Sequence, residues 1–146
     1  MSDLSSKLGF RAAVALIARW EGFEEEAYWD VKQWSIGFGT KSKKGERITR
    51  RLARVRMERV VSRIYNRIES ICLACSSNQV ASLTSFAYNV GRGNLQRSTL
   101  WRLALQGRHR EAEEQFNRWV FADGSKLNGL KRRRNSERRL YQSYQF

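Results

Sequence analysis

The sequence predicts an α+β fold in which one helix precedes a small antiparallel sheet and a larger group of helices follows. Three observations support this prediction. Apolar residues recur at helical spacing between Arg11 and Glu21. Residues 27–38 alternate apolar positions with small or polar ones, as half-buried strands do. Helical spacing returns after Thr49 and continues toward the C-terminus, which places a helical majority after the sheet.

The length of 146 residues suits one domain. A chain of this size buries roughly 68–70% of the surface that its unfolded form exposes, so it needs no disulfide or metal to fold. The sequence has no proline, internal repeat or low-complexity segment that would mark a linker. We therefore expect residues 1–146 to form a single domain, with a small sheet lobe at about 23–49 and a helical lobe built from 1–22 and 50–146.

The first helix is expected to end at Gly22, because glycine suits a C-terminal stop. A short strand is expected at 27–29, and a second strand carries Trp34, Ile36 and Phe38 on one face. The segment KSKKGE at 41–46 has the composition of a turn. Residues 47–48 are then expected to return as the third strand.

Thr49 is expected to cap the first helix after the sheet. The predicted apolar face of this helix consists of Leu52, Val55, Val60, Val61, Ile64, Ile68 and Ile71. Further helices are expected at 78–90, 98–106, 110–120 and 130–144. Glycines mark the turns between them, the last at Asp123-Gly124.

The formal net charge of +14 implies attraction to a polyanion. Nucleic acid, an anionic membrane face and an acidic cell-wall polymer all qualify, and charge alone does not choose among them. Cys72 and Cys75 stand three residues apart in an apolar run and are interpreted as two buried structural thiols, which suits synthesis in a reducing compartment. The only histidine, His109, lies far from them, so the sequence implies no metal and no cofactor.

Carboxylates are concentrated near the start of the chain, although the protein is strongly basic. Glu21 lies at the end of a helix, where the negative end of the macrodipole and the flanking aromatic residues are expected to raise its pKa. Asp30 lies nine residues later in polar sequence, where its pKa is expected to stay low. Two carboxyl groups with separated pKa values are typical of glycosidic bond hydrolysis. The acidic residues at 24–26 between them are interpreted as a solvated strand edge.

The motif EGF…AYWD…WSIGFGT, which contains Glu21 and Asp30, resembles the signature of the phage-type lysozymes, the endolysins that cleave bacterial peptidoglycan. Two later stretches, 79–107 and 118–140, resemble the central and closing motifs of the same family in the same order. The resemblance implies a lysozyme-like fold with the active-site cleft between the sheet lobe and the helical lobe.

The resemblance also implies roles for particular residues. Glu21 matches the general acid, Asp30 matches the catalytic aspartate, and Ser35 occupies the position of a threonine that places water. The implied reaction is cleavage of the β-1,4 bond between N-acetylmuramic acid and N-acetylglucosamine. Compared with the family pattern, the loop between Asp30 and Ser35 is one residue shorter and lacks a glycine. The candidate substrate-binding residues are Asn89, Tyr28 and Phe86, of which Phe86 also suits the core.

The arginine-rich segment 131–139 has several possible uses. Arg133 and Arg134 can pair with Glu137 or with acids near the cleft, while the outer arginines can meet wall carboxylates, lipopolysaccharide or an anionic membrane. The family implies a monomer that accumulates in the host cytoplasm and reaches the periplasmic cell wall once another protein has permeabilised the membrane, or one that travels in the virion. Residues 12–18 are interpreted as a mature helix rather than a signal peptide.

Two other classes of function remain open at this point. A lysozyme-fold protein with weakened catalysis would bind the cell wall without cutting it. A nucleic-acid-binding protein would explain the charge, but it would leave the carboxylate cluster unexplained because acids repel phosphate. We therefore expect peptidoglycan, and not nucleic acid, to be the partner.

Overall fold

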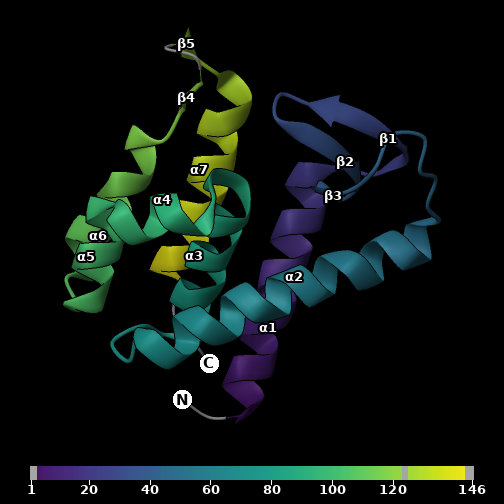
Figure 1. Cartoon of the computed structure of the whole chain (residues 1–146). Helices are drawn as coiled ribbons and strands as arrows, with labels where there is room; N and C mark the ends of the chain where they lie inside the picture. The colour runs from purple at the N-terminus through teal and green to yellow at the C-terminus, as the bar shows by residue number, and fades with distance from the viewer. Residues whose placement is uncertain (1–2, 123–124, 144–146) are drawn as a thin grey trace.

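The computed structural model describes residues 3–122 and 125–143, and it confirms the predicted α+β fold (Figure 1). A first helix, α1 (Asp3–Glu21), leads into a three-stranded antiparallel sheet in the order β1 (Glu24–Asp30), β2 (Gln33–Gly37) and β3 (Thr40–Lys41). The later elements are α2 (Arg50–Ile71), α3 (Ser77–Val90), α4 (Arg92–Arg97), α5 (Thr99–Leu105), α6 (His109–Gln115), the short 3-10 helix η1 (Phe116–Arg118), β4 (Phe121–Ala122), β5 (Ser125–Lys126) and α7 (Asn128–Gln142).

Helix α3 lies at the centre of the helical part, and α1, α2 and α7 all pack against it (Figure 1). Its residues are buried without interruption from Val80 to Ala87. A capping box begins the helix: the Ser76 hydroxyl accepts from the Gln79 backbone N–H, and the Gln79 side chain accepts from the Ser76 backbone N–H. The core is therefore built around one helix that reaches solvent only near its ends.

Helix α1 begins at Asp3, eight residues before the predicted start at Arg11. Close packing explains part of this extension. A β-carbon at Gly9 would lie 2.3 Å from the Tyr65 hydroxyl and 2.8 Å from the Ser77 side chain. Glycine destabilises the interior of a helix, so its presence argues against a helix in the sequence. Here the missing side chain lets α1 approach α2 and α3 closely.

The third strand lies at Thr40–Lys41, so the prediction of a strand at 47–48 was wrong. Gly37 and Gly39 have φ values of 66° and 78°, and this left-handed backbone reverses the chain directly after β2. Thr40 and Lys41 then pair with Ile36 and Ser35. In the backbone ladder, the predicted strand contributes an isolated bridge between Arg47 and Glu26, with a hydrogen bond from the Ile48 N–H to the Glu25 carbonyl at 2.9 Å.

The β1–β2 hairpin turns at Val31 and Lys32, within the loop that lacks the usual glycine. Val31 has a φ of 50°, the left-handed conformation, and it is the only residue other than glycine in the described part of the chain that adopts a positive φ. Its side chain is 81% exposed, so no packing offsets the conformational cost. The loop therefore places a strained residue directly after Asp30.

Thr49 caps α2 as predicted, with its hydroxyl accepting from the Leu52 backbone N–H at 3.2 Å. The predicted apolar face is only partly correct. The buried residues are Ala53, Met57, Val61, Ile64, Tyr65 and Ile68. Leu52, Val55 and Ile71 are instead 46%, 44% and 45% exposed. The buried stripe of the helix is thus rotated away from these three residues, because Ala53 and Tyr65 belong to it.

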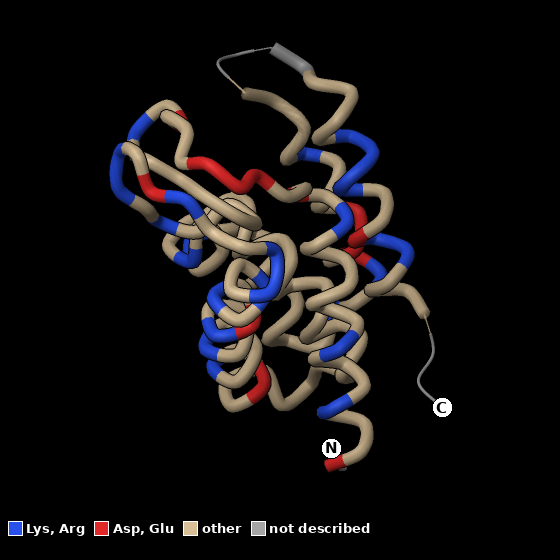
Figure 2. The backbone as a smooth tube through the Cα atoms, turned by 90° about the vertical axis from the view of Figure 1, so that its right-hand side faces the viewer, with Lys and Arg blue, Asp and Glu red and all other residues tan. Residues whose placement is uncertain are grey.

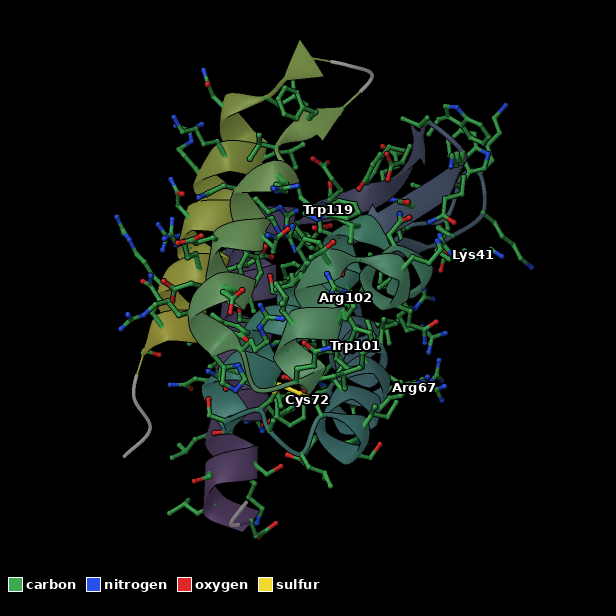
Figure 3. All side chains as sticks on the ribbon, turned by 90° about the vertical axis from the view of Figure 1, so that its left-hand side faces the viewer. Lys41, Arg67, Cys72, Trp101, Arg102 and Trp119 are labelled. Atoms are coloured by element: carbon green, nitrogen blue, oxygen red, sulfur yellow. A yellow bond between two sulfur atoms is a disulfide. The ribbon has the colours of Figure 1, made fainter. Side chains whose placement is uncertain are left out.

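A disulfide bond joins Cys72 and Cys75, so the interpretation as two free thiols was wrong (Figure 3). Cys72 ends α2, and the turn that follows brings the two α-carbons to 5.4 Å, inside the range that a disulfide spans. Both residues are buried. Burial in an apolar run was therefore predicted correctly, but their covalent state was not.

The remaining helices differ from the predictions mainly at their ends. Helix α4 was not predicted, and the segment expected at 110–120 divides into α6 and η1. The last helix begins at Asn128, while the predicted end at Tyr144 and the turn at Asp123-Gly124 lie outside the described residues. Within the described ranges, no helix combines the length and apolar character needed to cross a bilayer.

Candidate active site

Four polar side chains share one face of the β1–β2 hairpin. Tyr28 pairs with Ser35 and Asp30 pairs with Gln33 in the antiparallel register. Residues two apart on a strand point to the same side, so these two pairs form a block of four neighbouring side chains. Lys41 pairs with Ser35 from β3 and continues the same row. We call Tyr28, Asp30, Gln33 and Ser35 the hairpin quartet.

Tyr28 lies within electrostatic reach of carboxylates on two different elements. Burial raises the pKa of the Tyr28 hydroxyl, and the carboxylates of Asp30 and Glu21 raise it further. Both charges act on one phenol, although they belong to different elements: Glu21 ends α1 and Asp30 ends β1. Tyr28 of the hairpin quartet is therefore electrostatically coupled to the end of α1.

Glu21 is held between two contacts. Its carboxylate accepts a hydrogen bond from Arg133 of α7, with 2.5 Å between Oε2 and Nη1. On the other side it lies against Gly39, where a β-carbon would come within 2.5 Å of Oε1. The Glu21 side chain is 19% exposed, and that of Arg133 is 5% exposed. The sequence prediction for Glu21 considered the helix end and the flanking aromatic rings, whereas the structure adds a permanently charged partner.

A buried ionic network holds Arg133 in place. Arg133 also contacts Glu137, with 3.3 Å between Nε and Oε2, and donates to the Ser85 carbonyl at 3.2 Å. Glu137 is completely buried and accepts a second hydrogen bond from the Ser85 hydroxyl at 2.6 Å. Arg134, also completely buried, donates to Glu137 and to the Asn89 amide oxygen. Both guanidinium groups and the carboxylate are thus satisfied inside the protein, as buried charges must be.

Tyr88 closes the site from α3. Its hydroxyl donates to the Phe38 carbonyl at 2.5 Å, which fixes the backbone next to Gly39. Burial raises the pKa of Tyr88, and Glu21 raises it further. Phe38 packs on Phe23, with 5.7 Å between ring centroids. The turn that contacts Glu21 is therefore anchored to both the sheet and α3.

The three predicted substrate-binding residues differ in how far they are exposed to solvent. Asn89 is exposed and is oriented by Arg134. Tyr28 is half-buried in the hairpin quartet. Phe86 is completely buried, packs edge-on against Trp119 and lies under the Arg134 guanidinium at 4.9 Å. Phe86 therefore has the core position that the sequence also allowed.

Ser35 is completely buried, and its hydroxyl accepts a long hydrogen bond of 3.4 Å from the Gln33 amide. Gln33 itself is exposed. The polar group beside Asp30 that reaches solvent is thus the Gln33 side chain, with Ser35 behind it. Sequence reasoning did not single out Gln33 or Gly39. Gln33 stands two residues before Ser35, so a strand would place both side chains on one face. The sequence did not reveal that Gln33 pairs with Asp30, and this register is what brings Gln33 into the site.

Together, the fold and this group of residues define a lysozyme-like protein. The chain belongs to the phage lysozyme family, whose profile matches residues 18–137. This match confirms the resemblance seen in the sequence motifs. It also covers Glu21, the hairpin quartet and the arginines of α7.

Comparison with individual proteins agrees with this assignment. The chain is 30% identical over 141 residues to the endolysin of Bacillus phage B103. Among solved structures, it resembles the muramidase domain of SpmX from Asticaccaulis excentricus, with a TM-score of 0.84 and 28% identity over 92% of this chain and 97% of that chain. It also resembles the endolysin from Escherichia coli O157:H7 phage FAHEc1, with a TM-score of 0.77 and 29% identity over 90% and 91%.

The curated relatives are longer than this chain. The match to the Bacillus phage B103 endolysin covers 90% of this chain and 52% of the relative. The chain therefore spans about half the length of the curated relatives it matches.

Proposed function

We propose that the protein is a peptidoglycan hydrolase that cleaves the β-1,4 bond between N-acetylmuramic acid and N-acetylglucosamine. The observation that supports this proposal is that Glu21, at the end of α1, lies against Gly39 of the turn between β2 and β3, while Asp30 ends β1 of the same sheet. Two carboxyl groups from different elements thus border one sheet, and glycosidic hydrolysis uses such a pair of carboxyl groups. The family assignment supports the same reaction class, since relatives bear the names endolysin and muramidase.

In this mechanism Glu21 protonates the glycosidic oxygen as the bond breaks. The Arg133 guanidinium then stabilises the carboxylate that Glu21 becomes, because it already bonds Oε2 at 2.5 Å. Asp30, exposed at the end of β1, stabilises positive charge that develops on the sugar and helps to orient water. The protonated Glu21 required for the first step carries no charge, so its bond to Arg133 is weakest at that moment.

Ser35 and Gln33 complete the water site. Ser35 is buried and Gln33 covers its hydroxyl, so Ser35 acts on water through the Gln33 amide. Asn89, held by Arg134, is the polar group that we assign to the glycan from the helical side. Tyr28, two residues before Asp30 on β1 and opposite Ser35, is assigned to the border of the sugar site.

Digestion of purified peptidoglycan by the wild type and by Glu21→Gln tests the reaction. The wild type is expected to release new reducing ends, and the variant is expected to be slower by about 10²–10⁴-fold, the range for loss of a general acid. Unfolding curves of both proteins check that the variant is folded. Release of free amines instead of reducing ends would assign the protein to the amidases or peptidases. Undiminished cleavage by the variant would remove Glu21 from the mechanism.

The same assay separates the alternatives. A catalytically weakened wall-binding protein would sediment with peptidoglycan without releasing reducing ends. A nucleic-acid-binding protein would bind duplex DNA with a steep salt dependence that Glu21→Gln leaves unchanged. We propose that the protein accumulates in the host cytoplasm and acts on the periplasmic cell wall after the membrane has been permeabilised. Carriage in the virion is a second possible route. We also propose that the protein acts as a monomer.

A further inference from the structure

The outer side of α2 carries an unusual row of residues. Leu52, Val55, Arg59, Arg63 and Arg67 follow one another at steps of three or four residues, so they form one continuous ridge along the helix. All five are exposed. We call this row the α2 ridge. It is apolar toward the start of the helix and basic toward its end, and blue segments recur along α2 in Figure 2.

The three arginines of the α2 ridge have no carboxylate partner among the described residues. Neighbouring arginines differ: Arg54 pairs with Glu58 and Arg56 pairs with Glu46. Like charges four residues apart repel one another on a helix surface. Arg59, Arg63 and Arg67 therefore destabilise α2 slightly, and nothing within the described fold compensates them.

The ends of α2 also carry charges opposite to those that stabilise a helix. Arg50 and Arg51 occupy the first turn, where the macrodipole is positive, and the first turn contains no acidic residue. Glu69 lies in the last turn, which contains no basic residue. The charges at the two ends of α2 are thus not arranged for the stability of the helix itself, which favours an external anionic partner.

The basic end of the ridge borders a recess. An open hollow of about 510 Å³ is lined by Arg67, Arg92, Gly93 and Gln96, which come from α2 and α4. Figure 3 labels Arg67 at the edge of the molecule. Within the described residues, neither Arg67 nor Arg92 has an ion pair. Two forked donors facing one hollow suit the phosphate of a headgroup.

We propose that the α2 ridge binds the surface of an anionic lipid bilayer. The three arginines and Arg92 meet headgroup phosphates, while Leu52 and Val55 enter the boundary between headgroups and acyl chains. These apolar side chains, 46% and 44% exposed, distinguish a bilayer from a nucleic acid or a hydrophilic polymer, which would leave them in water. A helix of 22 residues is about 33 Å long and can lie along a membrane surface.

This assignment differs from the sequence expectation, which placed membrane or lipopolysaccharide contact on the last helix. In α7, Arg133 and Arg134 are buried in the ionic network, and Arg138 pairs with Glu113. The exposed cations left on α7 are Lys131, Arg132 and Arg139. They provide a matched control, because replacing them removes the same charge as replacing Arg59, Arg63 and Arg67.

Binding to sedimentable vesicles tests the proposal. The vesicles contain equal parts of phosphatidylglycerol and phosphatidylcholine, with pure phosphatidylcholine as the neutral reference. The triple variant Arg59→Gln, Arg63→Gln, Arg67→Gln is expected to bind anionic vesicles about 100-fold more weakly than the wild type. The variant Lys131→Gln, Arg132→Gln, Arg139→Gln is expected to stay within a few-fold of the wild type. Equal losses in both variants would show that net charge, and not the α2 ridge, governs binding.

A second pair of measurements separates a bilayer from other polyanions. The variant Leu52→Ser, Val55→Ser keeps every charge and is expected to bind anionic vesicles several-fold more weakly while binding duplex DNA like the wild type. Unchanged vesicle binding by this variant would overturn the bilayer proposal. All substituted side chains are exposed, and thermal unfolding checks the fold of each variant. Vesicles contain no glycan, so the outcome is independent of the proposed hydrolase activity.

Discussion

Gly39 and Glu21 touch so closely that the carboxylate occupies the space a β-carbon of residue 39 would need, 2.5 Å from Oε1. Gly39→Ala is therefore expected to displace the Glu21 side chain and to slow peptidoglycan cleavage at least 10-fold. The left-handed backbone at position 39, with a φ of 78°, adds a stability cost of about 1–2 kcal/mol. Initial rates of reducing-end release and urea unfolding measure the two effects separately.

Gly45→Ala is the control for this substitution. Gly45 has a similar φ of 83°, but nothing lies within 4 Å of a β-carbon built there. Its alanine variant should lose similar stability and retain its rate. Equal rates for the two alanine variants would contradict the proposed role of the contact between Gly39 and Glu21.

Gln33→Ala is expected to lower kcat by about 10-fold, the equivalent of one hydrogen bond to the reacting water, and to leave KM nearly unchanged. The reason is that Gln33 lies opposite Asp30 and covers the Ser35 hydroxyl. Lys32→Ala, in the same loop, should keep the wild-type rate. A fully active Gln33→Ala combined with an impaired Ser35→Ala would return the water-placing role to Ser35.

Val31→Gly is expected to stabilise the protein by about 0.5–1 kcal/mol, because glycine adopts a φ of 50° without the steric cost that valine has there. The exposed valine side chain contributes no packing that would be lost. The midpoint of urea unfolding measures the change. Lys32→Gly, at the neighbouring position without a positive φ, should not stabilise the protein, and a loss of stability in Val31→Gly would show that the turn is unstrained.

Glu137→Gln is expected to destabilise the protein by about 3–5 kcal/mol, because the substitution leaves two buried guanidinium groups facing a neutral amide. Arg133 and Arg134 both contact this carboxylate, which is completely buried. Thermal and urea unfolding provide the measurement. Glu113→Gln, which breaks the more exposed pair with Arg138 at 3.7 Å, is the comparison and should cost at most about 1 kcal/mol. Similar losses in both variants would argue against a special role for the network.

Hydrogen bonds from Arg56 and Ser42 lower the pKa of Glu46 to about 2, from an ordinary value of 4.5. Because the folded pKa lies below the unfolded one, the stabilising contribution is present above about pH 4.5 and is lost as the pH falls toward 2. An NMR titration of the Glu46 carboxyl carbon should show this low value. In Arg56→Gln the pKa should move back toward 4.5, and an identical titration in both proteins would contradict the assignment.

Local signals predicted much of the fold from the sequence. Thr49 begins α2 as expected because a side-chain cap depends only on residues within one turn. The third strand was misplaced because sequence composition located the reversal at KSKKGE, whereas the left-handed Gly37 and Gly39 turn the chain earlier. Helix α4 was missed because Leu95 is its only buried residue, so it shows no apolar period.

For the candidate site, the sequence proposed residues but few of their contacts. Glu21, Asp30 and Ser35 were identified from a family motif, which preserves residue order. The prediction that Arg133 and Arg134 pair with Glu137 or with acids near the cleft is confirmed. It did not single out Glu21, because Arg133 lies 112 residues away. The disulfide was missed for a different reason: cysteines three residues apart suit a helix and a turn equally well, and the turn after α2 decides between them.

The bond between Glu21 and Arg133 joins the end of the first helix to the last helix of the chain. A nascent polypeptide on the ribosome consequently carries Glu21 without its cationic neighbour until α7 has been synthesised and has docked. Products of premature termination lack that neighbour altogether. Assembly of the site thus waits until α7 has emerged from the ribosome.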